Sequence, residues 1–363
     1  MFPICFGTGD YFWNASCSDR EKINVIRRAI DSGINIIDTA PEYGNGKSEQ
    51  LVHTAIKGNE DQVIICTKVS PRNFAYKDLI KSVEKSLWYL GVDRIDLLTL
   101  HWPNPNIPCT DTIEGLLILL ESNKIASVGL SNFTLKSILL YKELLQEYLS
   151  TIQMEFNLNE QTIKTNGVLD YCKTQKMPLM GYSPLDQGRL YEFSEEQSKI
   201  LEKIEIKYGV TRSQVILSYI ISQSPIYPII RTTSLAHLKT NVEAINLHLD
   251  DTDMKIMNSS FPASIHLVET DKIEVCETGE WDHDVYLTYE EALANKFNHV
   301  PSPEALAKFI KRGEFLKPVR LRKKIAPNGS KEYLLIGGRV RFWAWQIAHK
   351  NKNTKIAAYI KTQ

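Results

Sequence analysis

Four ionisable side chains stand at the ends of three consecutive apolar segments of the chain. Asp38 ends the segment INIID and Tyr43 follows five positions later, Lys68 ends VIICTK, and His101 directly follows IDLLTL. A phenol with a pKa of about 10 is a weak acid at neutral pH, but a neighbouring ammonium stabilises the phenolate. The set predicts acid catalysis, with Tyr43 as the acid, Lys68 beside it, Asp38 fixing Lys68, and His101 donating to a substrate oxygen.

Each of these side chains also has a purely structural interpretation. Asp38 could cap a turn, Lys68 could be solvated, and His101 could be a hydrogen-bonded histidine of the core. Taken singly, these interpretations are favoured. Taken together, four such groups at successive segment ends favour catalysis, provided that the segments are neighbouring parallel strands whose carboxyl ends meet at one edge.

The elements that would position these residues recur along the chain. Short apolar segments begin near Pro3, Ile34, Val63, Ile95, Ile125, Ile152, Pro178 and Ile226, about thirty residues apart except for a longer last interval. Helical patterns lie between them, such as the one formed by Leu79, Val83, Leu87 and Leu90 at the 3.6-residue period. A strand and a helix repeated eight times predict a closed (β/α)8 TIM barrel of the α/β class.

Composition sets limits on the whole chain. The 363 residues, 43% hydrophobic and 24% charged, are enough for a large core and two domains. We expect a cytoplasmic protein without membrane contact, because no leader pattern or long apolar run is present. The six cysteines are scattered without a CxxC pair, which favours reduced thiols. The spacing of Cys276, Asp282, His283 and Asp284 fits no standard zinc or calcium pattern, so no metal is assigned.

The charge distribution separates the two ends of the chain. The formal net charge is zero, yet residues 281–363 hold 16 Lys and Arg against 7 Asp and Glu. Such a split suggests two modules with different partners, although scattered surface charge gives the same count. We expect the barrel over residues 1–262, an acidic irregular connector over 263–284, and a small α+β domain over 285–363. Within that domain the sequence predicts helices at 303–312 and 341–349 and a strand at 333–336.

The segments GINIIDTAPEYGNGKSEQLV, TKV, LTLHWP, GLSNF, TIQMEFN, YSPLDQGRL and IIRTTSLAHLKTN resemble, in order, the motifs of the aldo-keto reductase family over residues 3–260. The resemblance implies a TIM barrel that binds a nicotinamide cofactor without a Rossmann domain and reduces carbonyls. It implies that Tyr43 protonates the carbonyl oxygen, that Asp38 and Lys68 tune Tyr43, and that His101 orients the carbonyl.

The same resemblance implies a set of cofactor contacts. Ser131, Asn132 and Gln153 match positions that bind the nicotinamide amide, and Tyr182 matches the aromatic residue that stacks on its ring. The full expected set is Ser131, Asn132, Gln153, Tyr182, Ser183, Leu185, Arg231, Thr232, His237 and Asn241. Arg231 could bind a 2′-phosphate in a bidentate manner. His237 stands where the family pattern has an arginine, so a permanent charge is replaced by a side chain that titrates near neutral pH. NADPH is therefore favoured, and NADH stays open.

Aromatic residues near the predicted mouth suggest the walls of a substrate pocket. Tyr11, Phe12 and Trp13 follow the first strand and Trp102 follows His101, which suits a sugar face or an apolar aldehyde. Core packing is an equally open interpretation. The family usually begins with a short hairpin that plugs the barrel bottom, whereas here the first strand is expected almost at Met1. We therefore expect the connector or the small domain to cover that end.

The C-terminal sequence PSPEALAKFIKRGEFLKPVRLR, followed by YLLIGGRVRFWAWQIAHKNKNTKIAAYIK, resembles a ParB/sulfiredoxin-type domain. That resemblance implies a nucleotide phosphate site, for ATP or CTP, at Gly337, Gly338, Arg339 and Arg341. The family cysteine position is Arg339 here, which excludes sulfinic acid repair. DNA contact through residues 321–324 is less favoured, because Phe342, Trp343 and Trp345 suit a core.

Three functions remain open from the sequence. The first is an NADPH-dependent carbonyl reductase fused to a nucleotide-binding-like module. The second is a regulatory protein that senses nicotinamide redox state in the barrel and binds nucleotide or DNA through the basic tail. The third is a bifunctional enzyme with phosphotransferase or NTPase activity in the tail. Intact Asp38, Tyr43, Lys68 and His101 favour the first.

Overall fold

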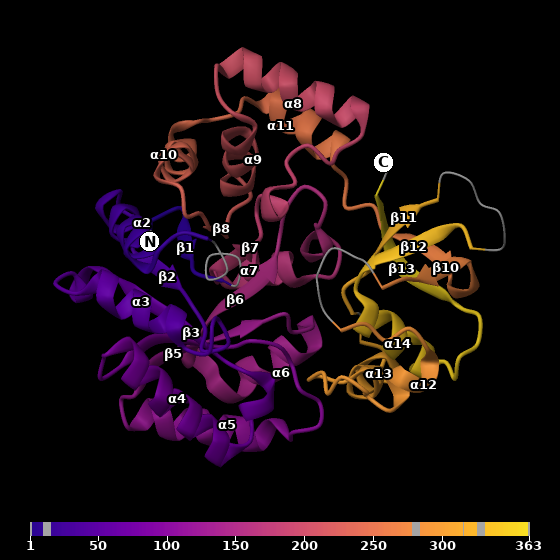
Figure 1. The fold of residues 1–363 in the computed structure, drawn as a ribbon, viewed down its shortest axis with the longest axis horizontal. Coiled ribbons are helices and arrows are strands. Elements are labelled where there is room, and N and C mark those ends of the chain that lie inside the picture. The colour runs from indigo at the N-terminus through magenta and orange to yellow at the C-terminus, as the bar shows by residue number, and fades with distance from the viewer. Residues whose placement is uncertain (1, 10–15, 278–283, 315, 325–330, 362–363) are drawn as a thin grey trace.

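A closed barrel of eight strands forms the larger part of the protein (Figure 1). The computed structural model describes residues 2–9, 16–277, 284–314, 316–324 and 331–361. Each barrel strand pairs in parallel with the next, and the first pairs with the last. The predicted TIM barrel is confirmed. Its strands are β1 (Cys5–Gly7), β2 (Ile36–Asp38), β3 (Ile64–Val69), β4 (Ile95–Leu100), β5 (Ile125–Ser131), β6 (Leu149–Glu155), β7 (Leu179–Tyr182) and β8 (Ile226–Ile230).

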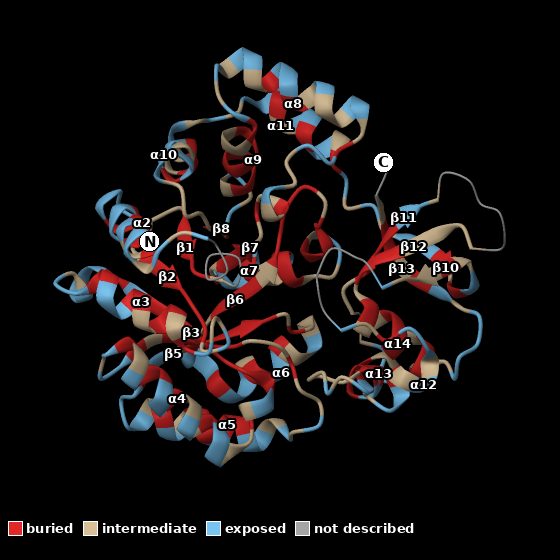
Figure 2. Cartoon of the chain, viewed as in Figure 1, coloured by how far each residue is buried: buried red, intermediate tan, exposed pale blue. Residues whose placement is uncertain are grey.

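Successive residues of each strand point to opposite faces, which creates two apolar layers. On β3, Cys66 faces a small cluster inside the barrel, whereas Ile65 faces the large cluster between strands and helices. Gly129 marks a close approach between strands, because a Cβ there would lie 2.7 Å from Thr99 Oγ1. Most of the barrel-strand residues are buried in Figure 2, while the outer faces of the helices are exposed.

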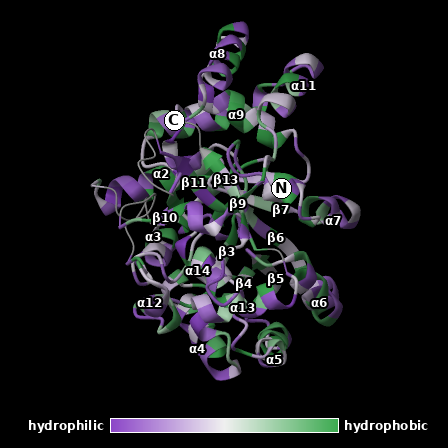
Figure 3. Ribbon diagram, turned by 90° about the vertical axis from the view of Figure 1, so that its right-hand side faces the viewer, coloured by the Kyte–Doolittle hydropathy of each residue, from purple (hydrophilic) through white to green (hydrophobic). Residues whose placement is uncertain are grey.

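Helices surround the barrel and bury one face each against it. They are α2 (Asp19–Asp31), α3 (Lys47–Ile56), α4 (Tyr76–Leu90), α5 (Cys109–Glu121), α6 (Leu135–Leu145), α7 (Val168–Gln175), α8 (Glu195–Tyr208), α9 (Arg212–Ile221), α10 (Leu235–Glu243) and α11 (Asp251–Ser260). The predicted stripe of α4, including Leu79 and Leu87, is buried, and Gly91 ends the helix in a left-handed conformation. In Figure 3 hydrophobic and hydrophilic residues alternate along the helix ribbons, as expected for amphipathic helices. Within the described residues, no helix has the length and apolar character that crossing a bilayer requires.

A second, smaller domain follows and is built on a five-stranded sheet of order β10-β12-β11-β13-β9. Its strands are β9 (His266–Glu269), β10 (Ile273–Val275), β11 (Val319–Lys323), β12 (Tyr333–Gly337) and β13 (Lys355–Lys361), and its helices are α12 (Tyr289–Leu293), α13 (Pro303–Lys311) and α14 (Arg339–Ala348). The predicted strand at 333–336 is confirmed, and both predicted helices are present with slightly different bounds.

The segment expected as an irregular connector contributes both edge strands of this sheet. β9 pairs with β13 and β10 pairs with β12, so much of 263–284 belongs to the small domain. Each edge strand buries little apolar surface, with only Val268 on β9 and Ile273 on β10 fully buried. Such short strands have no clear period-two pattern, which explains why the sequence did not reveal them.

The small domain has its own core. Phe342 and Trp343 of α14 pack with Leu321 and Leu335 of the sheet, as the sequence predicted for these aromatic residues. The indole Nε1 of Trp343 donates to the carbonyl oxygen of Tyr286 at 2.7 Å, so the polar atom of this buried ring is satisfied.

The small domain packs over the loops that follow β3, β4, β5 and β6. In chain order of the loops, the bonded pairs across the interface are Arg72 with the backbone of Asn298, Asn106 with Lys308, Thr134 with Glu314, and Thr162 with Tyr359. These loops lie at the carboxyl face of a parallel barrel. The expectation that this domain covers the barrel bottom is therefore wrong, because its contacts fall at the opposite end. At the bottom, the N-terminal Phe2 ring packs beside Gly33. Figure 3 is viewed from the side of the small domain.

Candidate active site

The four ionisable residues predicted from the sequence meet at the carboxyl face of the barrel. Asp38 ends β2, Lys68 lies in β3, and His101 directly follows β4. Lys68 Nζ donates to Asp38 Oδ2 at 2.7 Å and to the carbonyl oxygen of Thr39 at 2.8 Å. The same ammonium lies 5.1 Å from the centroid of the Tyr43 ring. The structure thus brings together the expected acid Tyr43, the Lys68 cation and the Asp38 carboxylate that binds it.

Burial makes the charge of Lys68 dependent on its neighbours. Its side chain is 1% exposed, and that of Asp38 is 8% exposed. Desolvation lowers the pKa of Lys68, but the Asp38 carboxylate and the Tyr43 phenol outweigh this effect and hold that pKa above its ordinary value. Gln153 Nε2 donates to the second carboxylate oxygen of Asp38 at 2.8 Å. Lys68 therefore stays a cation next to Tyr43 at neutral pH.

His101 also lies beside Tyr43 and has a partner that the sequence did not reveal. The rings of Tyr43 and His101 meet edge to face, with centroids 6.0 Å apart. His101 Nδ1 lies 2.7 Å from Glu42 Oε2, and the hydroxyl of Ser70 donates to Glu42 Oε1 at 2.7 Å. The signal that could have found Glu42 is its position directly before Tyr43, in the same turn as the predicted acid.

Polar groups expected to bind nicotinamide cluster at the ends of β5, β6 and β7. Asn132 Nδ2 donates to Ser131 Oγ at 2.9 Å and to the carbonyl oxygen of His101 at 3.3 Å. Tyr182 donates its hydroxyl hydrogen to Asn132 Oδ1 at 2.8 Å. Gln153, the third expected amide ligand, donates to Asp38. These groups therefore lie directly beside the catalytic candidates.

The loop after β7 has an unusual backbone. Ser183, Asp186 and Gln187 all have positive φ values, of 52°, 43° and 59°. Non-glycine residues in this conformation are uncommon and cluster at functional sites. Gln187 Nε2 is buried without a hydrogen-bond partner among the described residues, while the neighbouring Leu185 packs against the barrel core. An unsatisfied buried donor in this loop suits an additional ligand.

The residues expected to bind the adenosine phosphate follow β8. Thr232 Oγ1 accepts from the backbone nitrogen of Ser234, the N-cap of α10; His237 is exposed on that helix and Asn241 is buried. Arg231 has a different orientation. Its Nη1 atom and the Tyr43 ring both approach Gly9, because a Cβ atom added to Gly9 would lie within 4 Å of each. The structure thus places Arg231 toward the catalytic residues, unlike the rest of this group.

Of the four aromatic residues expected at the substrate pocket, the structure describes one. Trp102 follows His101 and its ring centroid lies 6.5 Å from that of His101. Tyr11, Phe12 and Trp13 lie outside the described residues, as do Asp282 and His283 of the rejected metal pattern.

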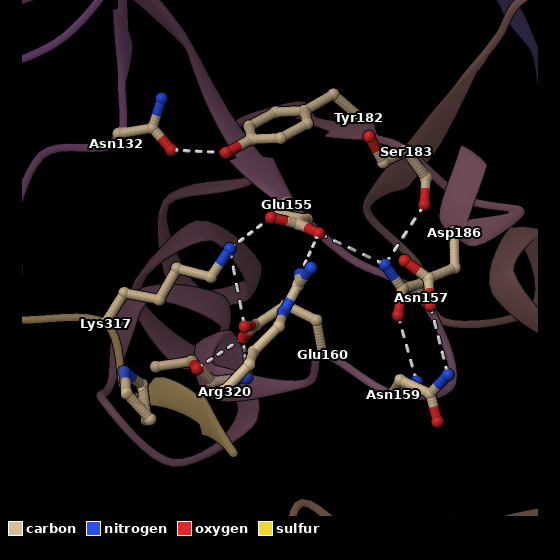
Figure 4. Close-up of polar contacts among 12 residues, drawn as sticks. Asn132, Glu155, Asn157, Asn159, Glu160, Tyr182, Ser183, Asp186, Lys317 and Arg320 are labelled. Atoms are coloured by element: carbon tan, nitrogen blue, oxygen red, sulfur yellow. Dashed lines mark hydrogen bonds and ion pairs between the residues drawn. The ribbon is translucent and has the colours of Figure 1, made fainter. Parts of the chain in front are cut away.

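A buried charge network links this mouth to the small domain, and the sequence did not predict it (Figure 4). Glu155, at the end of β6, pairs with Lys317 and Arg320, and Lys317 also lies 3.4 Å from Glu160. The carboxylates of Glu155 and Glu160 are 7% and 0% exposed. Burial and these two carboxylates raise the pKa of Tyr182 well above its ordinary value, so its hydroxyl stays protonated. The small domain therefore adjoins the expected nicotinamide site.

The expected phosphate site of the small domain lies at the start of α14. Gly337 ends β12, and Gly338 is the N-cap, in a left-handed conformation with φ of 83°. Arg341 folds back over Gly338 and donates to the carbonyl oxygen of Pro318 at 3.3 Å. Arg339 is 9% exposed, and its Nε and Nη2 atoms have no partner among the described residues.

Comparisons with known proteins agree with the barrel. Residues 3–262 match the protein-family model of the aldo/keto reductase family. The chain is 27% identical over 262 residues to methylglyoxal reductase YeaE of Escherichia coli K12, which covers 71% of this chain and 90% of that protein. It is 29% identical over 244 residues to 6-dehydroglucose reductase of Agrobacterium fabrum, covering 62% and 82% respectively. The crystal structure of an aldo/keto reductase from Klebsiella pneumoniae in complex with NADP and acetate has a TM-score of 0.67 at 28% identity, covering 72% of this chain and 92% of that one.

Proposed function

The chain belongs to the aldo/keto reductase family and is an NAD(P)H-dependent oxidoreductase, and from this premise we propose that it reduces a small aldehyde or ketone with NADPH, using Tyr43 as the general acid. The observation that carries the proposal is the buried Lys68 ammonium, held between the Asp38 carboxylate and the Tyr43 ring.

Each residue of the site has a distinct part in this reaction. The bound nicotinamide supplies a hydride to the carbonyl carbon. Tyr43 transfers its phenolic proton to the carbonyl oxygen, so the product is an alcohol and the phenol recovers a proton from solvent. Lys68 stabilises the phenolate left behind, and Asp38 keeps Lys68 charged and in place. His101 holds the carbonyl oxygen while negative charge develops on it.

The residues present fit a nicotinamide dinucleotide. Ser131, Asn132 and Gln153 offer donors and acceptors for the amide, and the ring of Tyr182 supplies a stacking surface. The unsatisfied Gln187 Nε2 atom lies in the adjacent loop and would offer a further donor to the cofactor. The relative from Klebsiella pneumoniae binds NADP. We propose NADPH as the cofactor, with Arg231 turning toward the 2′-phosphate when the cofactor binds.

The substrate class follows from the position of the small domain. That domain packs on four loops at the carboxyl face, and we propose that it limits the size of the substrate. Two relatives are named as reductases of methylglyoxal and of 6-dehydroglucose. We propose a substrate in the same range of size and polarity, from a short oxoaldehyde to a sugar carbonyl.

Consumption of NADPH by the full chain tests this proposal. The panel should run from methylglyoxal through sugar carbonyls to bulky aromatic aldehydes, with NADPH binding measured separately by fluorescence. We expect turnover with the small members and a fall in kcat/KM for the bulky ones. Tight NADPH binding without turnover across the panel would instead support the redox-sensing alternative.

A second proposal concerns the small domain alone. Arg339, buried with two unpartnered nitrogen atoms at the start of α14, favours an anion there, in line with a ParB/sulfiredoxin-like nucleotide site for ATP or CTP. Calorimetric titration of the full chain with ATP, CTP and diphosphate tests it. We expect at least one of these ligands to bind to the unaltered chain and not to Arg339→Met. Hydrolysis of ATP or CTP would in addition support the phosphotransferase or NTPase alternative. If none of the three ligands binds, the proposed nucleotide site in the small domain is wrong.

A further inference from the structure

Arg341 of the small domain has hydrogen bonds left to give at the interface with the barrel. Its guanidinium folds back over Gly338, the N-cap of α14, and its Nη2 atom donates to the carbonyl oxygen of Pro318 at 3.3 Å. Its Nε atom is buried without a hydrogen-bond partner among the described residues, whereas the residue as a whole is partly exposed. A ligand can therefore reach a cation whose donors are not all satisfied.

Arg341 adjoins the charge network between the two domains that Figure 4 shows. Pro318, its acceptor, directly follows Lys317, which bonds to Glu155 at the end of β6. Burial raises the pKa of Tyr182 and the Arg341 charge opposes that rise, so this charge lies within electrostatic range of the Tyr182 hydroxyl. Arg341 is thus close to the ring that is expected to stack on the nicotinamide.

Cations outnumber carboxylates in this part of the interface. Among the described residues, the network holds Lys317, Arg320 and Arg341 against Glu155 and Glu160. Burial lowers the pKa of Arg341 below its ordinary value, although Glu160 attracts its charge. An arginine side chain nevertheless keeps its proton in proteins, so one positive charge stays without a matching anion. Such burial costs free energy that a bound anion would recover.

The surroundings of Arg341 add to this excess of positive charge. Asp186, the third carboxylate labelled in Figure 4, is already paired with Arg189 at 2.6 Å. The N-cap of α14 is the glycine Gly338, so no N-cap side chain accepts from the N–H groups of the first turn. The dipole of α14 therefore favours an anion at the same end over which Arg341 folds.

The nicotinamide cofactor carries a suitable anion close to its ring. Asn132 and Tyr182, joined by a hydrogen bond of 2.8 Å, are expected to hold the nicotinamide end, and a single ribose separates that ring from the diphosphate. The diphosphate carries two negative charges and several acceptor oxygens, which suits the planar fork of a guanidinium. A charged substrate offers the same chemistry, but membership of the family requires the cofactor and leaves the substrate open.

We propose that Arg341 of the small domain binds the diphosphate of the nicotinamide cofactor, so that the second domain completes the cofactor site of the barrel. This inference rests on the proposed function. The bound diphosphate neutralises the guanidinium and accepts the hydrogen bonds that Arg341 otherwise leaves unmade. The cofactor is therefore held by residues of both domains.

The affinity of the full chain for NADPH and for NADH tests the inference without any turnover. Both cofactors carry the diphosphate, and only NADPH carries the 2′-phosphate. We expect Arg341→Met to raise both dissociation constants by about tenfold, because charge-assisted hydrogen bonds are lost. Arg322→Met, which removes an exposed cation of β11 in the same domain, should leave both constants unchanged. Fluorescence titration measures all three chains.

Urea unfolding without cofactor shows whether Arg341 is needed for the fold. Because no carboxylate among the described residues contacts Arg341, Arg341→Met should unfold at the same urea concentration as the unaltered chain or at a higher one. A clearly lower midpoint would place Arg341 among the residues that hold the interface together and would overturn the inference.

The outcomes separate this inference from the proposed function. If Arg341→Met weakens both cofactors but the unaltered chain reduces no carbonyl, the reductase is wrong and the role of Arg341 is supported. Unchanged constants in Arg341→Met overturn that role, whether or not carbonyls are reduced. An effect on NADPH alone also overturns it, because Arg341 would then bind the 2′-phosphate. Absence of binding of both cofactors to the unaltered chain contradicts the inference and the proposed function together.

Discussion

Glu155 at the end of β6 in the barrel is bonded to Arg320 in β11 of the small domain. Both side chains are almost fully buried, and Lys317 bonds to the second oxygen of the same carboxylate. A buried carboxylate held by two cations costs desolvation energy that is recovered only while all the partners are present. These three residues thus join the two domains beside the expected nicotinamide site. The contact is stable only while Glu155, Lys317 and Arg320 are all present.

Replacing Glu155 should weaken the interface between the two domains and lower the free energy of unfolding. Glu155→Gln leaves Arg320 and Lys317 without their shared anion, so we expect a loss of about 3–5 kcal/mol in unfolding free energy. Urea unfolding followed by fluorescence measures it. Glu195→Gln, which breaks an exposed pair with Lys199, is the matched control, with an expected effect of about 0.5 kcal/mol or less. Equal effects of both substitutions would show that the buried network does not hold the interface.

The same network predicts a loss of stability in acid. Burial raises the pKa of Glu155, but Arg320 and Lys317 outweigh this and hold that pKa well below its ordinary value. A carboxyl group with a lowered folded-state pKa contributes stability that is complete above its unfolded pKa of about 4.3 and is lost as pH falls toward the folded value.

We therefore expect the difference in unfolding free energy between the unaltered chain and Glu155→Gln to be constant near neutral pH and to shrink below about pH 4. Urea unfolding of both chains across this range gives the difference directly. A difference that stays constant into strong acid would mean that Glu155 is not ionised in the folded protein.

Tyr182 should have two separable effects on cofactor binding. Its hydroxyl donates to Asn132 Oδ1, so Tyr182→Phe frees that oxygen while keeping the ring. We expect NADPH to bind as tightly or a few-fold more tightly to Tyr182→Phe, and about tenfold more weakly to Tyr182→Ala, which loses the stacking surface. Fluorescence titration measures both. Equal weakening in the two variants would contradict a stacking role.

Removing the buried ammonium should slow the chemical step. Lys68→Met leaves Tyr43 without the cation that stabilises its phenolate and leaves Asp38 without its ion-pair partner. We expect kcat to fall by about 10²-fold or more, with the NADPH dissociation constant changed much less. Steady-state kinetics and cofactor titration test this together, with the exposed Lys57→Met as control. A loss confined to NADPH binding would assign Lys68 to the cofactor rather than to Tyr43.

The barrel and its acid group could be predicted because each rests on local signals. Apolar segments at regular spacing indicate strands, and Asp38, Lys68 and His101 stand directly at the ends of such segments. Parallel strands of one barrel bring their carboxyl ends together, so sequence position alone placed these residues side by side. Their ion pair and ring contacts then followed from the side chains present.

The contacts between distant parts of the chain could not be predicted in the same way. Glu155 and Arg320 are separated by 165 positions and belong to different sheets, so no periodicity connects them. Glu42 binds His101 across 59 positions for the same reason. The position of the small domain over the mouth depends on several such pairs. The sequence did not predict its edge strands β9 and β10, because each buries little apolar surface.

The most direct test of the catalytic role of Tyr43 is the rate of NADPH oxidation by Tyr43→Phe, compared with the unaltered chain on the same small aldehyde. The substitution removes the transferable proton and keeps the ring that lies beside Lys68. We expect turnover to fall by at least about 10²-fold while NADPH binds with nearly unchanged affinity. Turnover that survives in Tyr43→Phe at the rate of the unaltered chain would contradict the role of Tyr43 as the acid.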